Sequence, residues 1–406
     1  MKRISLLALL LFAGSTLSAQ VRRPSAPPPL PVPPPPARTD TGVGDALPRL
    51  SAAELARFNG GKQEFSDVES VADGLGPVFN GRSCGECHNV PSLGGGNRRL
   101  VTRIGTRTGN AFDALTRLGG SLLQDRAIGP RDGSAHAFRP EIVPQAATIV
   151  AHRRSTPLFG LGLVDATPDD VFVALAADQT SRRDGTAGRV SRVQNISAGM
   201  TTVGKFGWKA QVPTLFQFSG DAYLNELGIT SPQFADENCP QGNCAELAFN
   251  PAPAMNDLGD GVEALRDFMT FLAPPPRGRT SRDTDDGEQL FAQIGCGSCH
   301  VANLTTGRNA VAALDRVTYH PYSDFLLHDM GALGDGIEQG SATGRELRTS
   351  PLWGLRFVQT YLHDGRAVTL DEAILGHDGQ SRAARDRYSR LDQPSKDKLL
   401  AFLRSL

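Results

Sequence analysis

The spacing of apolar positions predicts a mainly helical protein, with its clearest helices in the second half of the chain. Residues 262–273 repeat apolar side chains at helical spacing and stop at the prolines 274–276, which cannot continue a helix. Segments 283–295 and 395–406 show the same spacing. Strand patterns are short and scattered, so we expect little strand.

Local sequence signals mark where the globular part begins, where loops lie and where one domain ends. Residues 51–54 have the spacing of a capping box, which opens a helix at the start of the globular part. Stretches 94–99 and 129–139 are rich in glycine and arginine, and we expect loops there. Because the three prolines form the best internal boundary, we expect one domain over residues 49–276 and a second over residues 277–406.

The N-terminus has the pattern of a secretory signal peptide. Two basic residues precede an apolar run over residues 4–13, and small residues follow near Ala19, so residues 1–19 are expected to be removed on export. The run is too short for a membrane anchor, and no lipoprotein cysteine follows it. Residues 20–48 are proline-rich and predict an extended spacer. We therefore expect a periplasmic protein that does not span the membrane.

Composition excludes some functions and suggests an internal duplication. The net charge is −1, which argues against nucleic acid as a partner because phosphate neutralisation needs an excess of Lys and Arg. The segments Arg154–Leu161 and Arg348–Leu355 share Arg, Pro, Leu, Gly and Leu at identical offsets. Each segment follows one of two cysteine motifs, so the chain resembles two related halves.

The two cysteine motifs carry the chemistry. Cys-x-x-Cys-His is the attachment pattern of c-type haem: two thiols form thioethers to the vinyl groups, and the histidine lies under the iron. A zinc site would need further ligands at recognisable spacing, and a redox dithiol would not need the histidine. We therefore expect two covalently bound c-type haems. The attachment and proximal residues are Cys84, Cys87, His88, Cys296, Cys299 and His300.

The other two cysteines and the other histidines need separate explanations. Cys239 and Cys244 enclose four residues, and in an exported protein they predict a small structural disulfide loop. The sixth ligand of each iron decides whether a haem transfers electrons or performs chemistry. The candidates are His136, His152, His320, His328, His363 and His377.

The motifs together resemble the bacterial di-haem cytochrome c peroxidase superfamily, and most closely its di-haem oxidoreductase family. The resemblance covers roughly residues 50–406 and implies two cytochrome-c-like domains, each with one covalent haem, long loops and little strand. The superfamily includes MauG and rubber oxygenase. The matching stretches are 204–210, 227–230, 328–331, Tyr361–Gly365, Thr369–Ala373 and Pro351–His377.

The resemblance implies a ligand for the second iron. In the peroxidases the sixth ligand, usually Met, follows the histidine of the Tyr-x-His-Asp-Gly motif by fourteen residues, and here that position is His377. His300 and His377 would then be the two axial ligands, as in the bis-histidine haem of rubber oxygenase. Thr369 and Glu372 have capping-box spacing, and Gly376 would end the helix before His377. A histidine lowers the haem potential relative to methionine, which weakens the analogy to the peroxidase relay.

Alternatives remain open at both irons. His328 and Met330 are the other candidates for the second haem. At the first haem the peroxidases place a displaceable histidine sixteen residues after the proximal one, where this chain has Ile104. His136 or His152 could reach that iron, and otherwise the site is open. The reactive haem of the superfamily is the N-terminal one, and its distal pocket is expected to be walled by residues 157–164, including Phe159.

The resemblance also suggests the catalytic residues. Trp208 matches a tryptophan that lies between the haems, and we expect it to link them. Glu226 matches the acidic residue that moves protons beside the iron, and Asp165 is the second candidate. The glutamine of the peroxidases falls near Phe218, with Gln217 adjacent, so it is shifted or lost.

The expected function is peroxide reduction at the N-terminal haem, with electrons passing through the C-terminal haem. The donor would be a small cytochrome, a cupredoxin or a redox-active substrate. A non-catalytic electron-transfer cytochrome and an oxygenase resembling rubber oxygenase are the alternatives; no free cysteine remains for thiol oxidation. The resemblance also allows a calcium ion between the domains. Val358 and Thr360 stand at the equivalent C-terminal positions, and neither side chain is a carboxylate.

Overall fold

A computed structural model describes residues 42–406, which all belong to one compact unit, Asp40–Leu406. The predicted signal peptide and most of the proline-rich spacer lie outside the described residues. Within the described part, no helix is long and apolar enough to cross a membrane. The predicted division at residue 276 into two haem domains stays a prediction.

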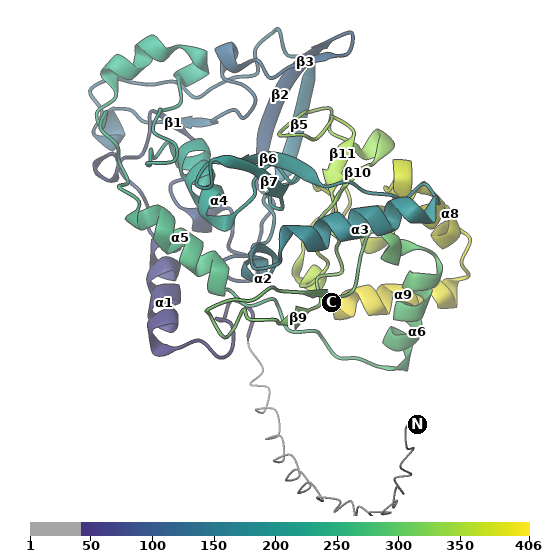
Figure 1. Cartoon of the computed structure of the whole chain (residues 1–406). Coiled ribbons are helices and arrows are strands. Elements are labelled where there is room, and N and C mark those ends of the chain that lie inside the picture. The colour runs from purple at the N-terminus through teal and green to yellow at the C-terminus, as the bar shows by residue number, and fades with distance from the viewer. Residues whose placement is uncertain (1–41) are drawn as a thin grey trace, which may run out of the picture. The chain divides into compact units, whose positions relative to one another are not determined.

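The fold is helical with some strands, joined by long loops and short 3₁₀ turns (Figure 1). The helices are α1 (Ala52–Ser66), α2 (Leu161–Asp165), α3 (Asp169–Arg182), α4 (Leu215–Ala222), α5 (Asp260–Phe271), α6 (Arg282–Gln293), α7 (Leu370–Leu375), α8 (Arg382–Ser389) and α9 (Gln393–Ser405). The strands are β1 (Val78–Phe79), β2 (Leu100–Thr108), β3 (Ala111–Asp113), β4 (Arg126–Ala127), β5 (Ile149–Arg154), β6 (Ser191–Asn195), β7 (Met200–Gly204), β8 (Leu304–Thr305), β9 (Thr318–Tyr319), β10 (Leu327–Asp329) and β11 (Glu346–Arg348).

Helices α1 and α5 pack against each other and support the first cysteine motif (Figure 1). The capping box predicted at residues 51–54 is present at the start of α1. Phe65 of α1 packs on Phe268 of α5, with ring centroids 4.7 Å apart. The two backbones approach closely at the buried Gly61, where a Cβ would lie 2.0 Å from the carbonyl oxygen of Ala264. The sequence at this crossing therefore requires glycine.

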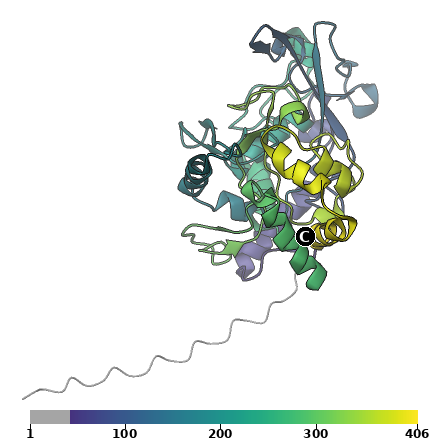
Figure 2. The same cartoon turned by 90° about the vertical axis from the view of Figure 1, so that its right-hand side faces the viewer.

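Helices α6 and α9 form the corresponding pair beside the second cysteine motif, and both views place them side by side (Figures 1 and 2). Phe291 of α6 contacts Phe402 of α9, with centroids 5.3 Å apart. A glycine again permits the close approach, because a Cβ on Gly287 would lie 2.1 Å from the carbonyl oxygen of Lys398. The predicted helices at 262–273, 283–295 and 395–406 are confirmed as α5, α6 and α9, within two residues at each end.

The sheets are small and antiparallel. The largest has the order β3-β2-β5, with Val101 opposite Arg153 and Arg103 opposite Ala151. The sequence pattern did not predict the nine-residue strand β2, so the expectation of only short, scattered strands was wrong here. The predicted loops at 94–99 and 129–139 contain short turns and no strand or α-helix.

Candidate haem centres

The first Cys-x-x-Cys-His motif forms a tight turn at the wall of a large cavity. Cys84 begins a 3₁₀ turn, and the backbone N–H of His88 donates to the Cys84 carbonyl at 3.0 Å. Cys84 and Cys87 are both free thiols, and both line the cavity together with His88. The cavity encloses about 1200 Å³, including space open to solvent. The two thiols and the imidazole therefore face one common space.

His88 is held in the form that binds iron. Its Nδ1 lies 2.9 Å from the carbonyl oxygen of Gly95, which accepts the N–H and leaves Nε2 free for a metal. Burial lowers the pKa of His88 to about 4, so the imidazole is neutral at physiological pH. A neutral ring with its second nitrogen fixed by a carbonyl is the usual arrangement of a metal-binding histidine.

The second motif repeats this geometry. Cys296 begins a 3₁₀ turn, and His300 Nδ1 lies 2.8 Å from the carbonyl oxygen of Tyr322. Burial lowers the pKa of His300 to about 4. Cys296 and Cys299 are both free thiols. The second motif therefore presents two thiols and one histidine in the same arrangement as the first.

His377 has the same local arrangement as His88 and His300. The predicted capping box, in which the Thr369 side chain accepts from the backbone of Glu372, opens α7, and His377 follows that helix directly. His377 Nδ1 lies 2.7 Å from the carbonyl oxygen of Ala373, which leaves Nε2 free. Burial lowers the pKa of His377, and the charge of His377 in turn contributes to lowering the pKa of His300. The role of His377 as an axial ligand together with His300 stays a prediction.

One wall of the first cavity carries cationic side chains on a strand. Arg99, Val101 and Arg103 alternate along β2 or immediately before it, and Arg153 lies on the same face of β5. Among the described residues, Arg99 Nε, Arg103 Nε and one terminal nitrogen of Arg153 are buried without a hydrogen-bond partner. Haem carries two anionic propionates, so these orphaned donors fit the cofactor that the cysteine motif predicts.

Another part of the cavity lining carries carboxylates. Glu226 lines the cavity, as does Asp221, which the sequence did not suggest. Asn80 Nδ2 donates to Glu226 Oε2 at 2.9 Å. Burial raises the pKa of both Glu226 and Asp221. Arg103 opposes this shift at both groups, because its positive charge favours the ionised carboxylates.

Trp208 lines the same cavity and also contacts the second half of the chain. Its Nε1 donates to the carbonyl oxygen of Arg154 at 2.9 Å, and its carbonyl accepts from the backbone N–H of Arg348. Its ring meets that of His363 edge to face, with centroids 6.2 Å apart. The placement suits the expected link between the haems, which stays a prediction.

Several other predicted residues lie elsewhere. Asp165 is outside the cavity lining, where its carboxyl is buried at the end of α2. Burial raises the pKa of Asp165 to about 6. His136 is 2.8 Å from Glu246, and His152 is exposed on β5. Within the described residues, His88 is therefore the only histidine that lines this cavity.

Of the residues 157–164 that were expected to wall the first haem pocket, Phe159 lies elsewhere. Leu158 lines the cavity, whereas Phe159 lines a smaller one of about 350 Å³ beside Trp353. Phe218 occupies the cavity wall near the expected glutamine position. The amide of Gln217 is used to hold backbone groups, since its Oε1 accepts from the N–H of Ile196 at 2.9 Å.

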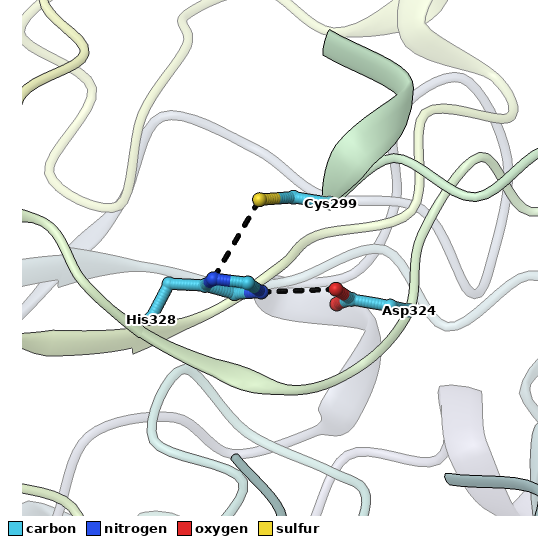
Figure 3. Close-up of side chains that lie close together, drawn as sticks. All are labelled: Cys299, Asp324 and His328. Atoms are coloured by element: carbon cyan, nitrogen blue, oxygen red, sulfur yellow. Dashed lines mark hydrogen bonds and ion pairs between the residues drawn. The ribbon is translucent and has the colours of Figure 1, made fainter. Parts of the chain in front are cut away.

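His328 forms a cluster beside the second motif (Figure 3). Its Nε2 is 2.9 Å from Asp324 Oδ2, and its Nδ1 is 3.6 Å from Cys299 Sγ. These contacts occupy both ring nitrogens, so His328 in this conformation has no nitrogen free for the iron. Cys299, Asp324 and His328 are residue types that bind metals, and their ligand atoms lie close together. A thioether bond to haem at Cys299 would, however, remove the thiolate that a metal would need as a ligand.

The predicted disulfide is confirmed: Cys239 and Cys244 are bonded. The calcium ion allowed by the resemblance stays a prediction. Sequence reasoning missed Asp221 and the arginines of β2 and β5. The spacing of Arg99, Arg103 and Arg107, four residues apart and therefore on one face of a strand, was the one signal that could have shown a polar cavity wall.

Comparison with known proteins identifies the family. Residues 141–406, well over half of the chain, match the family described as "Di-haem oxidoreductase, putative peroxidase". The matched range contains the second cysteine motif, Trp208, Glu226 and His377, while the first motif precedes it. No curated protein matches the chain.

Three solved structures are among those similar to the chain. They are a hydrazine synthase of Kuenenia stuttgartiensis (19% identity, 43% of this chain and 65% of that one, TM-score 0.28), a MauG-like protein associated with microbial copper homeostasis (15%, 90% and 93%, 0.38) and the diheme peroxidase BthA from Burkholderia thailandensis (14%, 86% and 86%, 0.39). On the strength of the family match, this chain belongs to the di-haem oxidoreductases and is a peroxidase-like enzyme.

Proposed function

We propose that the protein is an exported c-type cytochrome enzyme that reduces peroxide at its N-terminal haem. One observation carries the proposal: a single cavity is lined by Cys84, Cys87 and His88 and also by the carboxylate of Glu226. A haem attached to the cysteines would supply the iron through which electrons reach the peroxide. Dioxygen chemistry at the same iron is the second candidate, favoured by the histidine pair at the second haem.

The residues around the cavity would divide the work. His88 would hold the iron through Nε2, because Gly95 already occupies Nδ1. The orphaned guanidinium nitrogens of Arg99 and Arg153 would anchor the propionates. Glu226 would deliver a proton to a peroxide oxygen, since burial raises its pKa and favours the protonated form.

The second haem would relay electrons. His300 and His377 would hold its iron, each through a free Nε2. Two histidine ligands leave no open position, which suits electron transfer better than chemistry. Trp208 would lie on the route between the haems, because it lines the first cavity and contacts His363 of the second half. A small periplasmic cytochrome or cupredoxin would be the donor.

The test is peroxide consumption by the purified holoprotein with a reduced small cytochrome as donor. We expect turnover that falls by about 10²-fold or more in Glu226→Gln, the usual loss when an acid–base group is removed. Glu237→Gln is the matched control, because Glu237 is also a buried carboxyl with a raised pKa, of about 8, but lies outside the cavity lining. Oxygen uptake without peroxide turnover would instead support the oxygenase. The absence of both activities would refute the proposal.

Covalent attachment has its own test. The intact mass of the exported protein is expected to exceed that of the polypeptide by two haems. Cys84→Ser together with Cys87→Ser is expected to remove one haem and leave the second at Cys296 and Cys299. Retention of both haems in this variant would contradict the assignment of the first motif.

A further inference from the structure

The wall of the first cavity holds a carboxylate, that of Asp221, which the family motifs did not indicate. Helix α4 ends at Ala222 and continues as a π-helix over Tyr223–Leu227. In a π-helix the hydrogen bonds run from i to i+5, so residues five apart come onto one face, and such turns are frequent at functional sites. Asp221 and Glu226 are five apart across this turn, and both line the cavity.

Each carboxylate accepts one side-chain hydrogen bond among the described residues. Asn225 Nδ2 donates to Asp221 Oδ1 at 3.0 Å, and Asn80 Nδ2 donates to Glu226 Oε2 at 2.9 Å. Both donors are neutral amides, which do not compensate a carboxylate charge as a cation would. Each group also keeps a second oxygen that can carry a proton.

The charges facing the two carboxyls are unbalanced if both are ionised. Arg103 of β2 faces both groups, and Arg99 adds a smaller effect at Glu226. Arg103 has its own partner in Ser121 Oγ, at 3.2 Å, which carries no charge. Two carboxylates against one guanidinium would leave a net negative charge in a buried site, and one proton shared by the carboxyls would remove it.

We propose that Asp221 and Glu226 hold one proton between them and act as a pair in the cavity, with Arg103 balancing the remaining charge. This inference rests on the proposed function and adds Asp221 to it. In the proton-transfer step, the O–H bond of the protonated carboxyl breaks and an O–H bond to a peroxide oxygen forms. Two carboxylates then face Arg103, and the pair regains its proton from solvent. Reduction of one peroxide to two waters takes two protons and two electrons, and the donor protein supplies the electrons.

A proton shared by Asp221 and Glu226 would have two measurable effects. Like charges close together raise each other's proton affinity, so the proton belongs to the pair and not to either residue. Removing Asp221 should lower the pKa of Glu226, because the neighbouring negative charge is lost while Arg103 remains. Removing Arg103 should have the opposite effect. Independent carboxyls would not respond to each other in this way.

The experiment is infrared difference spectroscopy of the holoprotein, with and without cyanide, as a function of pH. Cyanide is the probe because it binds an open ferric haem and should perturb carboxyls that line the same cavity. We expect the wild type to show a carboxylic acid C=O band at neutral pH. Asp221→Asn and Glu226→Gln should each lose it at that pH, whereas Arg103→Gln should retain it to higher pH.

Control variants distinguish a failure of the carboxyl pair from a failure of folding or of the proposed function. Glu237→Gln should keep the difference band, because Glu237 is buried outside the cavity lining. An unchanged spectrum of the second haem shows that a variant has folded, and Arg103→Gln provides an independent variant if Asp221→Asn does not fold. A band of full size and unchanged pH dependence in Asp221→Asn would overturn the pair while leaving the peroxidase proposal intact. No cyanide binding by the wild type would overturn both.

Discussion

The crossing of α1 and α5 allows a sharp test of the fold around the first haem, because two adjacent glycines differ only in what faces them. Gly60 is exposed, and a Cβ there would meet no atom within 4 Å. Gly61 is buried, and its Cβ would lie 2.0 Å from the Ala264 carbonyl oxygen and 2.9 Å from the Phe268 nitrogen. Gly60→Ala and Gly61→Ala therefore make the same chemical change in the same helix with opposite consequences.

The expected magnitudes follow from two terms. Replacing a helical glycine by alanine stabilises a helix by roughly 1 kcal/mol, and both variants receive this gain. At Gly61 the obstacle is backbone and cannot rotate away, so α1 must move from α5. Overpacking of this kind costs about 1–3 kcal/mol. We expect Gly60→Ala to raise the free energy of unfolding by up to about 1 kcal/mol, and Gly61→Ala to lower it by up to about 2 kcal/mol.

The assay is urea denaturation of both holoproteins, followed by circular dichroism. Gly61→Ala should also shift the Soret band of the first haem, because Phe65 of α1 and Leu265 and Met269 of α5 line its cavity. Equal stabilisation by the two variants would refute the close approach of the helices. A Soret shift in Gly60→Ala would refute the argument that only the crossing is affected.

Three further predictions concern the two halves of the chain. Asp335 pairs with Arg153 at 2.7 Å and Lys209 at 2.9 Å, all with side chains at most 5% exposed, so Asp335→Asn should cost about 3–5 kcal/mol in urea denaturation. These cations hold the pKa of Asp335 below its usual value. The ionised carboxylate therefore stabilises the fold above about pH 4, and this stabilisation is lost as the pH falls through the lowered pKa. In Asp335→Asn the free energy of unfolding should depend less on pH in this acidic range. His377→Met should raise the midpoint potential of the second haem in a redox titration, and an unchanged potential would exclude His377 as its ligand. Trp208→Phe should slow electron transfer between the haems in stopped-flow experiments without altering either haem's spectrum.

Local signals predicted much of what the structure contains. The cysteine motifs, the disulfide and the capping boxes depend on residues close together in the sequence, so spacing alone is informative. Helix α5 was predictable because one face meets the core and the other meets solvent. Helices α6 and α9 follow the same rule.

The cavity walls were not predictable in the same way. Strand β2 carries Arg103 on an inward face, contrary to the usual pattern of apolar residues inside, because that face lines a cavity and not an apolar core. Asp221 was missed because the π-helix that follows it, and that places Glu226 on the same cavity wall, leaves no mark on the sequence pattern. Asp165 looked suitable by type, but it lies at the end of α2, outside the cavity lining. Such placements depend on tertiary contacts.

The central claim is an open first haem beside a second haem closed by two histidines. The most direct measurement is low-temperature EPR of the oxidised holoprotein, recorded before and after addition of cyanide. We predict one high-spin ferric signal, which cyanide converts to low spin, and one low-spin bis-histidine signal that cyanide leaves unchanged. Two low-spin signals, both unaffected by cyanide, would contradict the account and indicate a protein that only carries electrons.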